Sequence, residues 1–163
     1  MNNMKTTIIP ALLTLFIAIA LIFSGIYFFH INQQNNFTCA ANVTYLFEAN
    51  NPQEEALMTT KMRLHFENSK GVNLISGRLK QGDNSYVINR RIEFKYINKD
   101  NNYTLDTTNI LLSKDDDLPK NLGERYLYRF STERNESTHL TIIKLDSGKL
   151  LFTNGTLPYF LCE

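Results

Sequence analysis

The sequence predicts one N-terminal transmembrane helix followed by a mainly-β domain, an antiparallel meander of about eight strands that closes into a barrel or a partial barrel. Two observations predict this fold. Residues 7–29 carry no charged side chain, and their polar members are only Thr, Ser and Tyr. Residues 37–163 instead contain short stretches in which apolar and polar residues alternate, which is the period of half-buried strands. No stretch of this second part has a convincing amphipathic helical period.

The uncharged run is long enough to span a bilayer. A helix over residues 7–29 measures about 34 Å, against about 30 Å for the hydrocarbon core. Pro10 falls in its first turn, where a missing N–H costs least, and Tyr27, Phe28 and Phe29 lie at the far end, where aromatic rings suit the interface. A cleaved signal peptide is the alternative. Its apolar core would span about 7–15 residues and end at a small-x-small site, so we expect an uncleaved anchor.

The charges beside the anchor predict its orientation. Lys5 precedes the run, and the next basic residue is Lys61. The positive-inside tendency keeps residues 1–6 in the cytoplasm and exports the rest. Residues 30–36 then form a short polar stalk, and residues 37–163 form the exported β domain. Because the tail is too short to hold a domain, we expect any function on the exported side.

The alternating stretches predict the strands in order. The connections are short and contain Asn, Asp and Gly, and the link Asp146, Ser147, Gly148 is typical of a hairpin. One boundary stays open at residues 54–62, which fit either a helical turn or the start of a strand. Short sequential connections favour an antiparallel meander, and closure would protect its edges. The predicted strands are residues 37–47, 58–66, 72–80, 86–96, 103–112, 125–130, 138–145 and 149–152.

Two polar features interrupt the pattern. Arg90 falls on the apolar face of residues 86–96, and Asp115, Asp116 and Asp117 follow one another in a loop. A calcium loop would need an Asp-x-Asn-x-Asp-Gly pattern, which does not follow. We therefore interpret the three aspartates as a solvated acidic loop.

The chain has two cysteines, Cys39 and Cys162, at opposite ends of the predicted exported domain. In an oxidising compartment two such thiols usually pair. A redox-active pair is the alternative, but such pairs usually have close spacing such as Cys-x-x-Cys. We expect a structural disulfide that ties the carboxyl terminus to the first strand.

Composition argues against direct contact with nucleic acid. The chain has 17 Lys and Arg against 16 Asp and Glu, and Lys5 is the one charge before residue 48. An exported domain with balanced charges has no basic patch for phosphates. We therefore expect no direct binding of DNA or RNA.

No catalytic, cofactor or metal motif stands out, so we expect a protein that is not an enzyme and needs no cofactor. None of His30, His65 and His139 has a second ligand at metal spacing. His65 and His139 are candidates for pH sensing because imidazole titrates at about pH 6–7, and solvated histidines without a special role are the alternative. The many Tyr and Phe residues fit cross-strand core pairs, or the lining of a small apolar cavity that takes a small apolar ligand.

The layout resembles a known family. Phe37, Thr38, Cys39 and two alanines stand just beyond the anchor, and the last cysteine stands in Tyr159-Phe160-Leu161-Cys162-Glu163. This arrangement resembles the FidL-like family of enterobacterial inner-membrane proteins, and within that description the MyfF and PsaF accessory proteins of fibrillar adhesin regulation. ToxS and VtrC are functional analogues, and the VtrC analogue implies a lipocalin-like barrel.

The resemblance implies a location and a partner. The chain would be a single-pass protein of the bacterial inner membrane, with a cytoplasmic N-terminus and a periplasmic β domain. It would bind the periplasmic sensing domain of a membrane-bound, ToxR-like winged-helix transcription regulator as a heterodimer. That regulator would control virulence or fimbrial genes in response to an envelope signal such as pH, temperature or bile salt.

Two other classes of function use the same features. A structural component of a pilus or secretion assembly would have the same anchor and β domain but a different partner. An anchored periplasmic module that binds a bile-salt-like or lipid-like small molecule would act alone.

Overall fold

The computed structural model describes residues 13, 15–27, 36–49, 51, 54–155 and 157–163. Its contacts divide the chain into two compact units, residues 1–36 and residues 37–163, which are described separately. In the first unit residues 15–27 are helical. None of the helices within the described residues has both the length and the apolar character needed to cross a membrane. The predicted anchor, residues 7–29, extends at both ends beyond the described residues, as do the predicted tail and most of the stalk, so these remain predictions.

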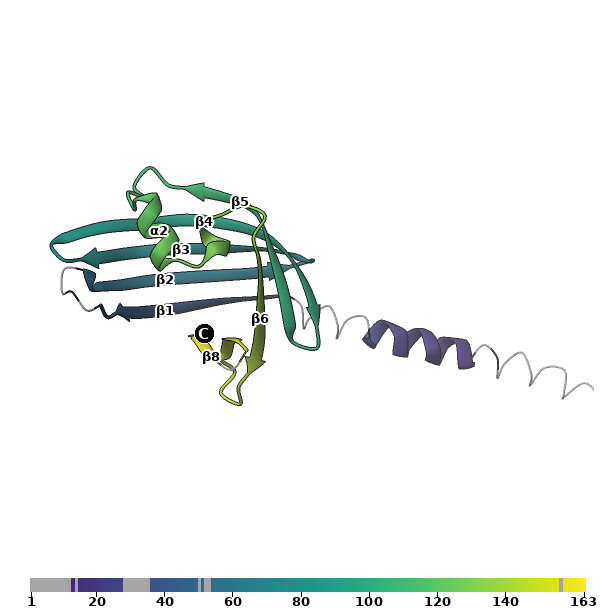
Figure 1. The fold of residues 1–163 in the computed structure, drawn as a ribbon. Helices are drawn as coiled ribbons and strands as arrows, with labels where there is room; N and C mark the ends of the chain where they lie inside the picture. Colours follow the sequence, from purple (N-terminus) through teal and green to yellow (C-terminus); the bar gives the residue numbers. More distant parts are fainter. Residues whose placement is uncertain (1–12, 14, 28–35, 50, 52–53, 156) are drawn as a thin grey trace, which may run out of the picture. The chain divides into compact units, whose positions relative to one another are not determined.

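The second unit is mainly β, with eight antiparallel strands in sequence order that form a nearly closed barrel. Figure 1 shows β1–β4 running side by side and β6 crossing their direction. The connections between β1 and β5 are short, so each strand pairs with the next along the chain. The strands are β1 Phe37–Phe47, β2 Ala56–Glu67, β3 Lys70–Gln81, β4 Asn84–Lys99, β5 Asn102–Leu112, β6 Ser137–Lys144, β7 Leu150–Asn154 and β8 Leu157–Cys162.

The two ends of the sheet meet where β8 reaches β1. Ala40 and Glu163 exchange backbone hydrogen bonds, with N···O distances of 2.7 and 2.8 Å. Beside them Cys39 and Cys162 form a disulfide that joins residues 123 apart in the sequence, and both cysteines are buried. The side chain of Lys149 also contacts the Glu163 carboxylate. The carboxyl terminus is therefore fastened to β1 by backbone hydrogen bonds and a disulfide, and to Lys149, just before β7, by an ionic contact.

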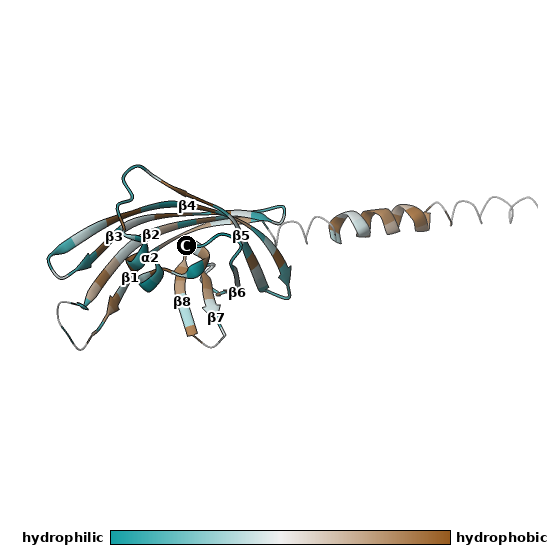
Figure 2. Cartoon of the chain, turned by 45° about the horizontal axis from the view of Figure 1, so that its top comes forward, coloured by the Kyte–Doolittle hydropathy of each residue, from teal (hydrophilic) through white to brown (hydrophobic). Residues whose placement is uncertain are grey.

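Alternation along the strands fills the barrel. In β2 every second residue from Ala56 to Phe66 is buried and the residues between them are exposed, and Figure 2 shows the corresponding bands of hydropathy. Phe66 is fully buried and its ring lies 4.4–5.7 Å from four other aromatic rings. Gly71 stands between Phe66 and Phe94 in register, and a Cβ there would lie 2.3 Å from the Phe94 ring. This position therefore requires glycine.

Most of the predicted strands are confirmed. β1 has the predicted bounds, and the hairpin turns use residues in the left-handed region, among them Asn68, Asp100 and Gly148. The open boundary at residues 54–62 is decided in favour of a strand, which begins at Ala56.

The prediction for residues 125–130 is wrong. Residues 125 and 126 end helix α2, Lys120–Tyr126, and residues 129 and 130 begin the short 3-10 helix η2, Arg129–Ser131. Tyr126 and Leu127 are both buried although they are adjacent, which a half-buried strand does not allow. The predicted count of strands is met by β8 instead. Residues 157–162 were not among the predicted strands. Pro158 lies beside the irregularity of the β7–β8 pairing, where proline is tolerated.

Removing the disulfide should weaken the second unit. Replacing both cysteines, Cys39→Ser and Cys162→Ser, releases a loop of 123 residues in the unfolded chain. The free energy of unfolding should fall by about 4–5 kcal/mol on the chain-entropy account. Urea unfolding of the two chains, followed by circular dichroism, measures the difference. A loss below about 1 kcal/mol would show that this loop closure contributes little to stability.

Candidate functional site

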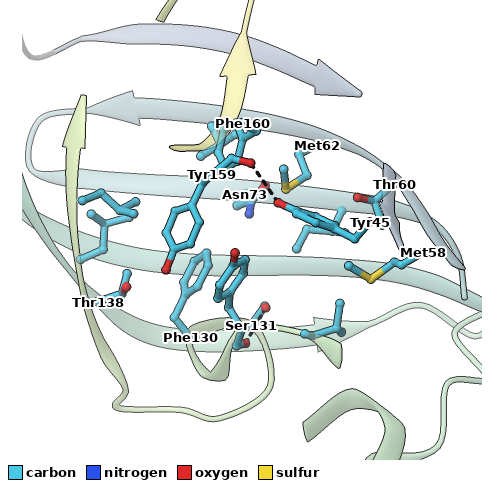
Figure 3. A pocket seen from close by; sticks show the side chains of 16 residues that line it. Tyr45, Met58, Thr60, Met62, Asn73, Phe130, Ser131, Thr138, Tyr159 and Phe160 are labelled. Atoms are coloured by element: carbon cyan, nitrogen blue, oxygen red, sulfur yellow. Dashed lines mark hydrogen bonds between the residues drawn. The ribbon is translucent and has the colours of Figure 1, made fainter. Parts of the chain in front are cut away.

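A pocket lies inside the barrel, between the strands and the α2–η2 segment. Its walls come from β1, β2, β3, β5, β6 and β8, and from the residues after α2 (Figure 3). The lining is apolar apart from a few hydroxyl and amide groups, and none of its residues is Asp, Glu, His, Lys or Arg. The lining residues are Tyr45, Met58, Thr60, Met62, Leu64, Asn73, Ile75, Leu105, Leu127, Tyr128, Phe130, Ser131, Thr138, Leu140, Tyr159 and Phe160.

Three tyrosines from distant parts of the sequence meet at this pocket. The Tyr45 hydroxyl donates to the backbone oxygen of Tyr159 over 3.3 Å, and the rings of Tyr128 and Tyr159 lie 4.6 Å apart. Burial, followed by the neighbouring phenols of Tyr45 and Tyr159, raises the pKa of Tyr128. Burial also raises the pKa of Tyr45. These two phenols therefore stay neutral near pH 7 and act as hydrogen-bonding groups rather than as bases.

Asn73 places an amide in the apolar wall. It lies on the inward face of β3, is 2% exposed and pairs in register with Leu64 and Ile92, which are also buried. Its Oδ1 atom is buried and accepts no hydrogen bond from the residues that the structure describes. Buried polar atoms are satisfied in most proteins, so this oxygen is an exception that calls for an explanation.

The pocket is small. The space available to the centre of a water-sized sphere is about 40 Å³. That is enough for a water molecule, which needs roughly 10–15 Å³ by this measure. A bile-salt-like or lipid-like ligand would not fit without movement of the lining.

A buried ion pair fixes the segment that bounds the pocket. Arg90 binds both carboxylate oxygens of Asp116, at 2.8 and 3.1 Å, and the two side chains are 6% and 1% exposed. The third nitrogen of the Arg90 guanidinium, Nη1, donates to the backbone oxygen of Ser131 in η2 over 3.5 Å. The guanidinium also lies beside Gly123 of α2. Arg90 therefore connects β4 to the acidic loop, to α2 and to η2.

The acidic loop was expected to be solvated, and this prediction is wrong for Asp116. Asp116 accepts a hydrogen bond from the backbone N–H of Asn89, and Asp117 accepts one from that of Val87. The backbone N–H of Asp117 in turn donates to the backbone oxygen of Val87. The loop thus provides hydrogen-bond partners for the backbone of β4 beyond the end of β5. Without the loop, this part of β4 would be an exposed edge to which another strand could pair.

The end of β5 has a neighbouring strand on one side only. β5 pairs with β4 as far as Leu112, but with β6 only over Asn102–Asp106. A bulge at Thr108, opposite Glu93 and Phe94, separates the two parts. In the part of the chain that the structure describes, residues 109–112 therefore form an open edge, which we call the β5 edge (Figure 1).

The hydrogen-bond pattern shows which backbone groups of the β5 edge point away from β4. The Ser113 N–H donates to the backbone oxygen of Asn89. Hydrogen-bonded and non-hydrogen-bonded pairs alternate along two antiparallel strands, so residues 111 and 109 are also in hydrogen-bonded pairs with β4. The N–H and C=O groups of Ile110 and Leu112 then point to the open side. Leu111 and Leu112 are 47% and 60% exposed. An apolar open edge of this kind is a site for strand addition.

The structure places the two candidate pH-sensing histidines on different strands. His65 on β2 contacts Thr38 through Nδ1 at 2.6 Å and Glu67 through Nε2 at 3.4 Å. His139 on β6 contacts Thr104 at 3.1 Å. Both side chains are exposed, and neither lines the pocket. Their role in pH sensing remains a prediction. Within the described residues no group of three His, Cys, Asp or Glu is placed to hold a metal ion.

Comparison with known proteins identifies the family of the chain. Residues 77–162, just over half of the chain, match the family described as "FidL-like putative membrane protein". The chain belongs to the FidL-like family. The matched region begins in β3 and ends in β8, so it includes Arg90, the acidic loop and the β5 edge. No match was found among curated proteins. The description of the family is that of a membrane protein.

Breaking the buried ion pair should destabilise the barrel strongly. Arg90→Met leaves the Asp116 carboxylate buried without its partner, so the free energy of unfolding should fall by about 3–5 kcal/mol. The neighbouring pair Arg91–Glu93 is a matched control because its side chains are 49% and 35% exposed. Arg91→Met should cost less than about 1 kcal/mol. Chemical denaturation of both variants checks this, and equal losses would contradict the role given to Arg90.

Proposed function

We propose that this FidL-like protein is a non-enzymatic accessory subunit of a membrane-bound, ToxR-like winged-helix transcription activator. Residues 7–29 anchor it in the bacterial inner membrane, with the N-terminus in the cytoplasm and the β domain in the periplasm. The β domain binds and stabilises the periplasmic sensing domain of the activator. Through that contact it tunes the expression of virulence or fimbrial genes in response to an envelope signal.

The observation that carries the proposal is the β5 edge. Ile110 and Leu112 present backbone donors and acceptors in a row, and Leu111 presents an apolar side chain beside them. Extended backbone in another protein satisfies such groups, and apolar side chains on the added strand would pack on Leu111 and Leu112. On the outer face Leu74 and Leu111 flank Arg91 in register, which extends the apolar surface next to the edge. The occupant we propose is a strand of the activator's periplasmic domain.

Two further features support the location. The Cys39–Cys162 disulfide suits an oxidising compartment such as the periplasm. Family membership supports attachment to a membrane. The uncharged run of residues 7–29 supports a single crossing.

The interior pocket favours a second candidate, an anchored module that binds a small molecule without a partner. Its lining is mostly apolar with a few polar groups, as in many ligand sites. A structural component of a pilus or secretion assembly would instead appear in a large complex of fixed stoichiometry.

Coexpression tests the partner directly. Residues 31–163 are exported to the periplasm together with the periplasmic domain of each ToxR-like regulator encoded beside the gene. We expect a stable 1:1 heterodimer by size exclusion with light scattering. A monomer with every candidate would contradict the accessory role and favour the lone binding module, and a dimer of this chain alone would assign the β5 edge to self-association.

Substitutions at the β5 edge test the mode of docking. Leu112→Pro removes a backbone N–H that points to the open side, and the Leu112 side chain is 60% exposed, so the change should weaken the heterodimer by at least about tenfold while the domain stays folded. Leu111→Pro removes an N–H that bonds to β4 and should destabilise the fold instead. Leu46→Asn is the surface control, because Leu46 is 64% exposed on β1 and should not affect binding. Equal effects of Leu112→Pro and Leu46→Asn on affinity would contradict docking at this edge.

A further inference from the structure

We propose that the interior pocket binds a compact, electrically neutral molecule with one hydroxyl or N–H group on an apolar body, and that Asn73 Oδ1 accepts the hydrogen bond from that group. This site is separate from the β5 edge and goes beyond the accessory role, because it involves the barrel interior alone. It assigns a ligand class to the pocket and a function to the unsatisfied amide.

Asn73 gives the pocket its specificity for a donor. Its neighbours across the sheet, Leu64 on β2 and Ile92 on β4, have no polar side-chain atom to offer it. The Oδ1 atom is nevertheless an acceptor that has been removed from water without compensation. Asn73 also lines the pocket, and Figure 3 shows it among the lining side chains. A ligand that donates a hydrogen bond to Oδ1 would remove this desolvation cost.

The rest of the lining excludes charge. None of the lining residues is Asp, Glu, His, Lys or Arg, and burial raises the pKa of the Tyr45 and Tyr128 phenols, which keeps them neutral at pH 7. An ionised carboxylate or ammonium group would therefore be buried without a partner, which is costly. This argues for neutral molecules and against carboxylates such as ionised fatty acids or bile salts in this pocket.

The size of the pocket sets the scale of the ligand. The free space of about 40 Å³ accommodates only a few atoms, so a ring needs some movement of the lining. Met58 and Met62 supply that movement most easily, because unbranched thioether side chains adapt to irregular shapes. Tyr128 is 41% exposed, so the wall reaches solvent at this residue. A single six-membered ring with one donor is the largest ligand that we expect to enter.

Methionine methyl NMR on the full-length chain in lipid nanodiscs tests the site. The chain has four methionines. Met58 and Met62 line the pocket, whereas Met1 and Met4 lie outside the described residues and serve as reference signals. Three probes of similar size are titrated at pH 7: phenol, which has a donor, toluene, which has none, and benzoate, which is charged. We expect saturable shifts of Met58 and Met62 with phenol, about tenfold weaker binding of toluene, and no saturable shift with benzoate.

A variant isolates the contribution of the amide. Asn73→Ala removes the acceptor and enlarges the pocket, so toluene should still bind and the preference for phenol over toluene should disappear. If that variant does not fold, the order of the three probes on the unsubstituted chain decides the question. Equal binding of phenol and toluene, or binding of benzoate as tight as that of phenol, would overturn the proposal. Absence of saturable shifts with all three probes would also overturn it, since the pocket would then be a hydrated cavity only. None of these results depends on the regulator partner.

Discussion

The unequal length of neighbouring strands is the constraint on which the other features of this domain depend. β2, β3 and β4 have 12, 12 and 16 residues, whereas β6, β7 and β8 have 8, 5 and 6. A barrel built from such strands cannot pair along its whole height. Backbone groups at the longer strands then need other partners. The acidic loop, the α2–η2 segment and the β5 edge all lie where a partner strand is missing.

The chain meets this need in three different ways. At β4, Asp116 and Asp117 bind the backbone directly, and Arg90 neutralises the buried Asp116 carboxylate. Next to the interior pocket, α2 and η2 take the place of strands. The Thr107 hydroxyl donates to the backbone oxygen of Phe130, which holds η2 in place. At residues 109–112 we find no comparable cover among the described residues. The exposed edge is therefore the part of the domain best suited to another protein, and the pocket beneath α2–η2 is the part best suited to a small molecule.

Sequence alternation predicted the larger part of the sheet because β1 to β5 obey a period of two with one buried face. It failed at residues 125–130, where Tyr126, Tyr128 and Phe130 alternate in the sequence but tertiary contacts with Arg90 and Thr107 impose helical turns. Arg90 and Asn73 were both at inward positions, and a polar residue in the buried phase was the available signal of their roles. The tyrosine cluster could not be predicted, because Tyr45, Tyr128 and Tyr159 come together only through barrel closure.

Residue-resolved hydrogen exchange of the β5 backbone tests the central claim most directly. In the chain alone, the amides of Ile110 and Leu112 should exchange at least about tenfold faster than that of Leu111, because only Leu111 bonds to β4. Addition of the regulator's periplasmic domain should protect Ile110 and Leu112 and leave Leu111 unchanged. Equal protection of the three amides in the chain alone would contradict the account, since the β5 edge would then be covered without any partner.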